Sequence, residues 1–137
     1  MHLNGTWYNT LGSSMKLAVE GQQVSGTYTT AVGEAQGRYP IVGAIDTESY
    51  NKSQAVGLVV IWSNEQGSSH SVTTWSGQLE MIDGQEILRA TWLLTRETPP
   101  DQDWQSTLVG ADIFTRYPPA WNQPDAINRR KPRSHPA

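Results

Sequence analysis

A period of two in the apolar residues constrains the fold of this chain more than any other feature of its sequence. Between residues 3 and 116, apolar residues recur at every second position in segments rich in Val, Ile, Thr, Trp and Tyr. Side chains alternate between the two faces of a strand, so this pattern is typical of half-buried β-strands. Clusters of Gly, Asn, Asp and Ser separate the segments, as expected for turns. The pattern predicts eight strands, at residues 4–10, 15–20, 24–30, 39–46, 55–62, 69–81, 85–95 and 106–116.

Short connections between these segments favour antiparallel neighbours, because a parallel pair needs a long crossover. Asp83-Gly84 is the strongest two-residue hairpin signal in the chain. Closing eight strands into a barrel removes the exposed edges of an open sheet and leaves room inside for side chains or one small ligand. We therefore predict an all-β fold, an eight-stranded antiparallel up-and-down β-barrel. A sandwich with Greek-key connections is the alternative.

The end of the chain differs in composition from the rest. Seven of the eight prolines lie beyond residue 98, and from Arg116 onward five basic residues accompany one acid, Asp125. Residues 3–116 are therefore predicted to form the domain, and residues 117–137 a Pro-rich, basic C-terminal tail. A solvated extension is one interpretation of the tail. The others are a peptide ligand for the barrel or a neighbouring subunit, anchored by Trp121, and a basic segment attracted to an anionic surface.

Composition and charge exclude several classes of function. The chain has 137 residues, of which 36% are hydrophobic, which suits one domain with a core of its own. It contains no cysteine, so thiolate metal sites and cysteine nucleophiles are excluded, and the formal net charge of −3 does not suggest a nucleic-acid partner. No stretch is apolar enough to span a membrane, and residues 1–30 lack the pattern of a signal peptide. If the protein is exported, we expect its signal to be absent from this sequence.

Tryptophan takes the place of the aliphatic residues that a sealed barrel core would contain. Five of the six tryptophans lie in or beside predicted strands: Trp7, Trp62, Trp75, Trp92 and Trp104. A buried indole needs a partner for its N–H, so structural packing is only one of two interpretations. Even spacing places polar residues on shared faces in three groups, which are Asn9, Leu11 and Ser13; Tyr28 and Thr30; and Ser71, Thr73 and Trp75. Aromatic walls with a few fixed polar groups are typical of small-molecule pockets.

Five separated blocks of sequence match one known pattern. They are NGTWYNTLGS at 4–13, GTY at 26–28 running to AVG at 31–33, HSVTTWSGQ at 70–78, TWLLT at 91–95, and Trp104 followed by STLVGADIFT at 106–115. In these blocks, which run in order through residues 4–116, the chain resembles the avidin and streptavidin family. The resemblance implies a non-catalytic barrel that binds biotin and needs no cofactor. It also implies a secreted or periplasmic homo-oligomer, either a tetramer or a dimer.

The resemblance implies that one group of residues recognises the ureido ring of biotin. Asn9, Ser13 and Tyr28 are implied to donate to the ureido oxygen, and Thr30 and Asp112 to accept from the two ureido N–H groups. The chemistry of a cyclic urea is consistent with this assignment, because its edge offers one strong acceptor and two donors. The charge on Asp112 strengthens its hydrogen bonds, since charge-assisted bonds are about twice as strong as neutral ones.

Other matching residues are implied to hold the rest of the ligand. Thr73 faces the thioether sulfur, while Ser71 and the backbone N–H groups of Val32, Gly33 and Glu34 hold the carboxylate. Glu34 would weaken that contact unless its own charge points outward. The implied walls of the pocket are Leu11, Val32, Trp62, Trp75, Trp92 and Leu94. Trp104 is implied to close the pocket of a neighbouring subunit.

Enzyme functions fit the pattern less well. A hydrolytic triad would combine His70 with Ser69 or Ser71 and with Asp112, yet His70 and Ser71 are adjacent on a strand and point to opposite faces. A glycosidase needs two facing carboxylates, and alternation places only one inside, Asp112, from the set Asp46, Glu80, Glu86 and Asp112. We therefore expect neither an enzyme nor a metal site.

A lipocalin-like carrier of another small apolar ligand is the main alternative to a biotin-binding protein. Pockets for apolar ligands contain few inward hydroxyl groups. Substitution of Asn9 or Tyr28 should therefore matter little in such a carrier and greatly in a ureido site.

Overall fold

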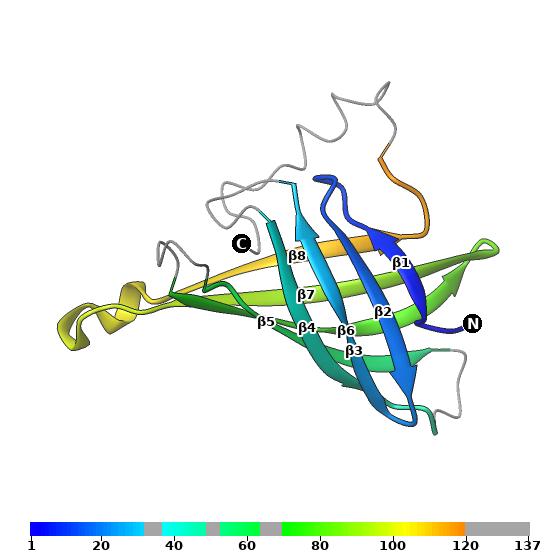
Figure 1. The fold of residues 1–137 in the computed structure, drawn as a ribbon, viewed down its shortest axis with the longest axis horizontal. Helices are drawn as coiled ribbons and strands as arrows, with labels where there is room; N and C mark the ends of the chain where they lie inside the picture. The colour runs from blue at the N-terminus through cyan, green and yellow to red at the C-terminus, as the bar shows by residue number, and fades with distance from the viewer. Residues whose placement is uncertain (32–36, 49–52, 64–69, 120–137) are drawn as a thin grey trace.

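The computed structural model describes residues 1–31, 37–48, 53–63 and 70–119. Within these residues the chain forms eight strands and one short 3₁₀ helix, and the strands join in chain order into a closed barrel (Figure 1). The elements are β1 (Gly5–Tyr8), β2 (Ser14–Glu20), β3 (Gln23–Thr30), β4 (Gly37–Ile45), β5 (Gln54–Ile61), β6 (Ser71–Ile82), β7 (Gln85–Arg96), η1 (Pro100–Gln105) and β8 (Thr107–Thr115). All neighbouring strands are antiparallel, including β1 with β8. The predicted up-and-down barrel is confirmed, and the Greek-key alternative is wrong.

The hairpin between β6 and β7 has the turn that the sequence predicts. Asp83 and Gly84 have φ values of 50° and 78°, and they connect Ile82 to its register partner Gln85. Two successive positive φ values are characteristic of a type I′ turn, whose twist matches that of the flanking strands. Asp tolerates this region better than most residues, and Gly adopts it freely.

The connection between β7 and β8 is more ordered than the predicted loop around Pro99-Pro100. Residues 100–105 form the helix η1, which begins at a proline, where a fixed φ favours the first turn. The predicted strand at 69–81 is observed as β6 from Ser71, and residue 69 lies outside the described residues. In the part of the chain that the structure describes, no helix has the length and apolarity needed to cross a bilayer.

The type of buried side chain changes along the barrel axis and divides the interior into two halves. We call the end at the Asp83-Gly84 turn the base, and the end where β1 is joined to β2 the mouth. Near the base, buried aliphatic side chains face one another across strand pairs, as Leu79 does with Leu88. Toward the mouth, the buried positions become aromatic and polar, and they include Asn9, Ser13, Tyr28, Thr30, Trp62, Ser71, Thr73, Trp75, Trp92 and Asp112. The base is therefore a packed core, and the candidate site lies in the mouth half.

Arg116 reinforces the shortest seam of the barrel. β1 and β8 share a single register pair, just before this residue. The Arg116 guanidinium carbon lies 3.7 Å from the centre of the Trp7 ring, and its nitrogens donate to the backbone oxygens of His2 at 2.6 Å and Thr6 at 3.3 Å. A cation over an indole and hydrogen bonds to backbone carbonyls both stabilise this closure. The predicted domain limit at residue 116 thus coincides with a side chain that ties the last strand to the first.

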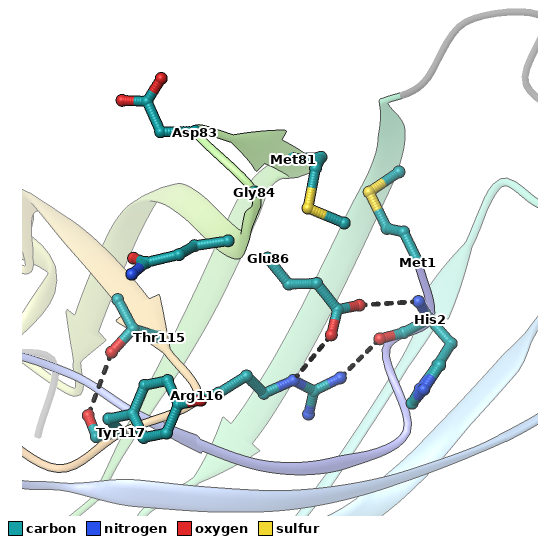
Figure 2. Close-up of a pocket in the computed structure, with 10 residues that line it drawn as sticks. Met1, His2, Met81, Asp83, Gly84, Glu86, Thr115, Arg116 and Tyr117 are labelled. Carbon is teal, nitrogen blue, oxygen red and sulfur yellow. Dashed lines mark hydrogen bonds and ion pairs between the residues drawn. The ribbon is translucent and has the colours of Figure 1, made fainter.

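Glu86 completes this clasp from β7 (Figure 2). Its carboxylate accepts from Arg116 Nε at 3.3 Å and from the His2 backbone N–H at 2.9 Å. Burial raises the pKa of Glu86, but these two donors outweigh it and hold the pKa below its ordinary value. The clasp borders an open surface pocket of about 660 Å³ at the base, lined by Met1, His2, Met81, Asp83, Gly84, Gln85, Glu86, Thr115, Arg116 and Tyr117. None of the predicted site residues lines this pocket.

Candidate functional site

Most of the predicted site residues that the structure describes are buried together inside the barrel. The buried ones are Asn9, Ser13, Tyr28, Thr30, Trp62, Ser71, Thr73, Trp75, Trp92, Leu94 and Asp112. Leu11 is partly buried beside them. Val32, Gly33 and Glu34 lie outside the described residues. Trp104 is not part of this group, because it lies on η1 with 79% of its surface exposed.

A turn, and not a strand face, brings Asn9 and Ser13 together. The sequence pattern predicted that these residues share one face of an extended strand, but β1 ends at Tyr8. Asn9 Oδ1 accepts from the backbone N–H groups of Leu11 at 3.1 Å and Ser13 at 3.0 Å, and Gly12 has a φ of 88°. Asn commonly forms such local bonds to the backbone, which compete with strand pairing. The two residues do lie together, but through a turn, so the predicted shared strand face is wrong.

This turn determines which way the Asn9 amide points. Because Oδ1 is occupied by the turn, the Nδ2 group is directed into the barrel, where it lies 3.5 Å from both the Tyr28 hydroxyl and Asp112 Oδ1. Ser13 is fixed in the same way, since its Oγ accepts from the Ala31 backbone N–H at 3.0 Å. The turn therefore presents amide and hydroxyl groups to the interior in a fixed orientation.

Asp112 is a buried carboxylate with a partner on each oxygen. It projects from β8 with 6% of its surface exposed, and it accepts from Trp75 Nε1 at 3.0 Å on Oδ2 and from Asn9 on Oδ1. Burial raises the pKa of Asp112 to about 6, and the hydrogen bonds from Trp75 and Asn9 lower it in part. The group is therefore mainly ionised at neutral pH and acts there as a hydrogen-bond acceptor.

Tyr28 supplies a phenolic hydroxyl to the same cluster. Its ring is stacked on Trp75, with centroids 5.3 Å apart at 29°, and meets the edge of Trp62 at 5.4 Å. Burial and the charge of Asp112 raise the pKa of Tyr28 well above its ordinary value, although hydrogen bonds with Ser13 and Asn9 offset part of that rise. Tyr28 thus keeps its proton at neutral pH and can donate a hydrogen bond.

The tryptophans are held in place by different contacts. Trp62 Nε1 donates to Thr73 Oγ1 at 2.6 Å, and the Trp62 ring packs edge-on against Tyr39, 5.0 Å away. Trp75 is held by Asp112, as described above. Trp92 is fully buried on β7, opposite Trp75, but within the described residues its indole nitrogen has no hydrogen-bond partner.

Two residues of the site were missed in the sequence. Tyr39 is 5% exposed and belongs to the aromatic cluster; its even spacing from Ile41 in an alternating segment was the available signal. Gly110 lies opposite Trp92 on β8, and an ideal Cβ built on it would lie 2.2 Å from Cζ2 of that indole. A glycine within a strand often marks such a close approach.

The enzyme alternatives gain no support from this geometry. His70 is exposed whereas Ser71 is buried, so the two side chains lie on opposite sides of the barrel wall, as predicted. The carboxylate of Glu86 is bound by Arg116 at the base, away from Asp112. Among the described residues, no group of three His, Cys, Asp or Glu side chains could hold a metal ion. The site can instead surround a small molecule with aromatic walls, inward donors and one anionic acceptor.

Comparison with known proteins connects this geometry to one family. A family model described as the Avidin family matches residues 1–117. The chain is 37% identical to avidin of Gallus gallus over 123 residues, which cover 83% of this chain and 77% of avidin. It is 30% identical to hoefavidin of Hoeflea phototrophica over 96 residues, covering 64% of this chain and 54% of hoefavidin. It is 32% identical to fibropellin-1 of Strongylocentrotus purpuratus over 128 residues, which are 90% of this chain but only 12% of fibropellin-1.

Proposed function

We propose that this chain, which belongs to the avidin family, binds biotin inside its barrel and catalyses no reaction. One observation carries the proposal: a buried cluster in the mouth half combines the Asn9 amide, the Tyr28 hydroxyl and the ionised Asp112. Burying these polar groups is unfavourable unless they are paired. Here they pair with one another through long contacts of 3.5 Å. A ligand with complementary donors and acceptors on one edge would replace those contacts with better ones, and a cyclic urea has that pattern.

In this proposal, each side of the ureido group meets a different part of the cluster. Asn9, Ser13 and Tyr28 donate to the ureido oxygen, and Asp112 and Thr30 accept from the two N–H groups. The retained proton of Tyr28 and the charge of Asp112 at neutral pH support these roles. Donors held in place before the ligand arrives do not have to be ordered on binding, which favours high affinity.

The remaining contacts in the proposal follow the ligand from its sulfur-containing ring toward the mouth. Thr73 faces the thioether sulfur, and Ser71 holds the carboxylate together with the backbone of residues 32–34, which lie outside the described residues. The proposed walls are Leu11, Val32, Trp62, Trp75, Trp92 and Leu94. Burial of the indoles and of Leu94 supports these contacts, because a ligand enclosed by rigid aromatic walls loses most of its hydration.

We propose that the protein is a homo-oligomer, a tetramer or a dimer, in which Trp104 closes the pocket of a neighbouring subunit. Two observations support this. Trp104 is 79% exposed, and the outer wall carries exposed apolar side chains on several strands: Val42, Ile61, Leu93 and Val109. Apolar patches of this kind often mark association surfaces. Light scattering should give the mass of a dimer or tetramer, and Trp104→Ala should speed biotin dissociation; a monomer would overturn the assignment.

The location of the protein and the role of its tail are also proposals. The family resemblance supports a secreted or periplasmic location, which fractionation of the source cells would test. For the tail, residues 117–137, docking on the barrel or on a neighbouring subunit is supported by its Pro-rich sequence and by the amide side chains flanking Trp121. If deletion of residues 117–137 changes neither the rate of biotin association nor the oligomeric state, docking is wrong.

Substitution of Tyr28 tests the biotin site against the alternative of an apolar-ligand carrier. Tyr28→Phe removes one hydroxyl from the ureido cluster and leaves the ring that packs on Trp75. We expect biotin to dissociate about tenfold to a hundredfold faster, as for loss of a hydrogen bond to a polarised group. Tyr117→Phe is the matched control, because Tyr117 is 72% exposed at the base and should leave the rate unchanged. Equal rates for the two variants would contradict the proposed function and favour a carrier.

A further inference from the structure

The three tryptophans proposed as walls differ in the hydrogen bonding of their indole N–H groups. Trp62 donates to Thr73, and Trp75 donates to Asp112. Trp92 is fully buried, yet among the described residues its Nε1 atom is the single buried side-chain nitrogen or oxygen without a partner. A buried donor left unpaired is destabilising, so such a group requires an explanation.

The side chains that flank Trp92 on the inner face of the barrel offer no acceptor for its N–H group. Trp92 lies between Trp75 on β6 and Gly110 on β8, and its inward neighbours on β7 are Ala90 and Leu94. None of these four side chains contains an oxygen. Gly110 is necessary for the position of the indole, because an ideal Cβ there would lie 2.2 Å from Cζ2, 2.5 Å from Cε2 and 2.9 Å from Cη2. The indole therefore lies directly on the backbone of β8, in a position that only glycine permits.

The acceptors closest in the strand register already have donors. Thr73 lies opposite Leu94, one inward position from the Trp75–Trp92 pair, and its hydroxyl accepts from Trp62. Asp112 accepts from Trp75 on one oxygen and from Asn9 on the other. Inward positions that are diagonal neighbours in a sheet lie within reach of large side chains. Thr73 and Trp92 are therefore diagonal neighbours on the inner face of the barrel and border adjoining parts of the interior.

We infer that the Trp92 indole N–H donates a hydrogen bond to the ring heteroatom of the ligand, which is the thioether sulfur in biotin. The inference rests on the proposed function and adds a specificity-determining contact to it. Trp92 then acts as more than an apolar wall, because it distinguishes a bicyclic urea with an acceptor atom in its second ring from one without. Sulfur is a weak acceptor, so this hydrogen bond contributes modestly to affinity. An oxygen in the same position should accept it at least as well.

Three ligands of nearly equal shape test this contact in the full-length protein. They are biotin, its oxygen analogue, and the carbocyclic analogue in which a CH₂ group replaces the sulfur. For each ligand, the dissociation rate is measured with the wild-type protein and with Trp92→Phe. We expect Trp92→Phe to speed the dissociation of biotin and of the oxygen analogue about threefold to tenfold more than that of the carbocyclic analogue. An equal loss for all three ligands overturns the inference but leaves biotin binding, and so the proposed function, intact.

Leu94→Ala is the matched control, because it removes wall area without removing a donor. Its loss of affinity should be the same for the three ligands. If Trp92→Phe does not fold, the indole ¹⁵N–¹H signals of the wild-type protein decide the question. The Trp92 proton should move downfield with biotin and the oxygen analogue relative to the carbocyclic complex, and identical shifts in the three complexes would overturn the inference. Absence of binding by all three ligands would overturn the proposed function, and the inference with it.

Discussion

Replacing Gly110 with alanine adds only one methyl group, but it should disturb the packing of the barrel interior strongly. The new Cβ would lie 2.2 Å from Trp92 Cζ2, whereas ordinary van der Waals contact begins at about 3.4 Å, so the indole must move by roughly 1 Å. Trp92 is fully buried and opposite Trp75, so this movement is resisted by packed neighbours. Overpacking of this kind costs about 1 to 3 kcal/mol of unfolding free energy, which corresponds to a fall in Tm of roughly 3 to 12 °C for a domain of this size.

Thermal unfolding of the ligand-free protein, followed by tryptophan fluorescence, measures this effect. Gly57→Ala is the matched control, because it makes the same change within strand β5 where the nearest atom to an added Cβ is 3.9 Å away. Its Tm should stay the same or rise slightly, since alanine lowers the entropy of the unfolded chain. If Gly110→Ala and Gly57→Ala have the same Tm, the close contact between Gly110 and the Trp92 indole is not present in solution.

Further predictions concern Asp112 and the Arg116 clasp. The pKa of Asp112 is raised from 3.8 to about 6, so the folded protein binds a proton at this carboxyl more tightly than the unfolded chain does. The contribution of this proton to the free energy of unfolding is therefore full below about pH 4 and is lost as the pH rises through 6. Asp112→Asn should remove this pH dependence in denaturant titrations. Binding should depend on pH in the opposite sense, because the proposed acceptor is the ionised form: affinity for biotin amide, which has no carboxylate to titrate, should fall about tenfold per pH unit below 6 and stay constant above it. A flat profile between pH 4 and 7 would contradict this role. Arg116→Ala should lower the unfolding free energy by about 2 to 4 kcal/mol, because it removes a cation from Trp7 and leaves Glu86 without its ion pair. Glu86→Gln should cost less, and an effect of Arg116→Ala no larger than that of Glu86→Gln in chemical denaturation would refute the clasp.

Much of the fold could be predicted because two local signals agree along the chain. Alternating apolar residues indicate strands, and Asp83-Gly84 indicates the hairpin that joins the two longest of them. The inward face of β6 could be predicted in the same way, since Ser71, Thr73 and Trp75 are all buried. These predictions succeed because a period of two assigns every residue of a strand to one face.

Other features could not be predicted because they depend on contacts between distant residues. Asn9 and Ser13 converge through a turn in which the Asn9 side chain bonds to the backbone, and a simple alternation rule does not include such bonds. The pairing of Trp75 with Asp112 joins β6 to β8, residues 37 positions apart in the chain. The close approach of Gly110 to Trp92 depends on the register of β7 and β8, which no local pattern specifies.

Calorimetric titration of the purified, ligand-free protein with biotin tests the central proposal most directly. The buried cluster of Asn9, Tyr28 and Asp112 predicts stoichiometric binding of about one biotin per chain, too tight for the curve to define a dissociation constant, with a matching change in tryptophan fluorescence. No heat of binding, or a dissociation constant in the micromolar range, would contradict it. That result would favour the alternative, a carrier of another small apolar ligand.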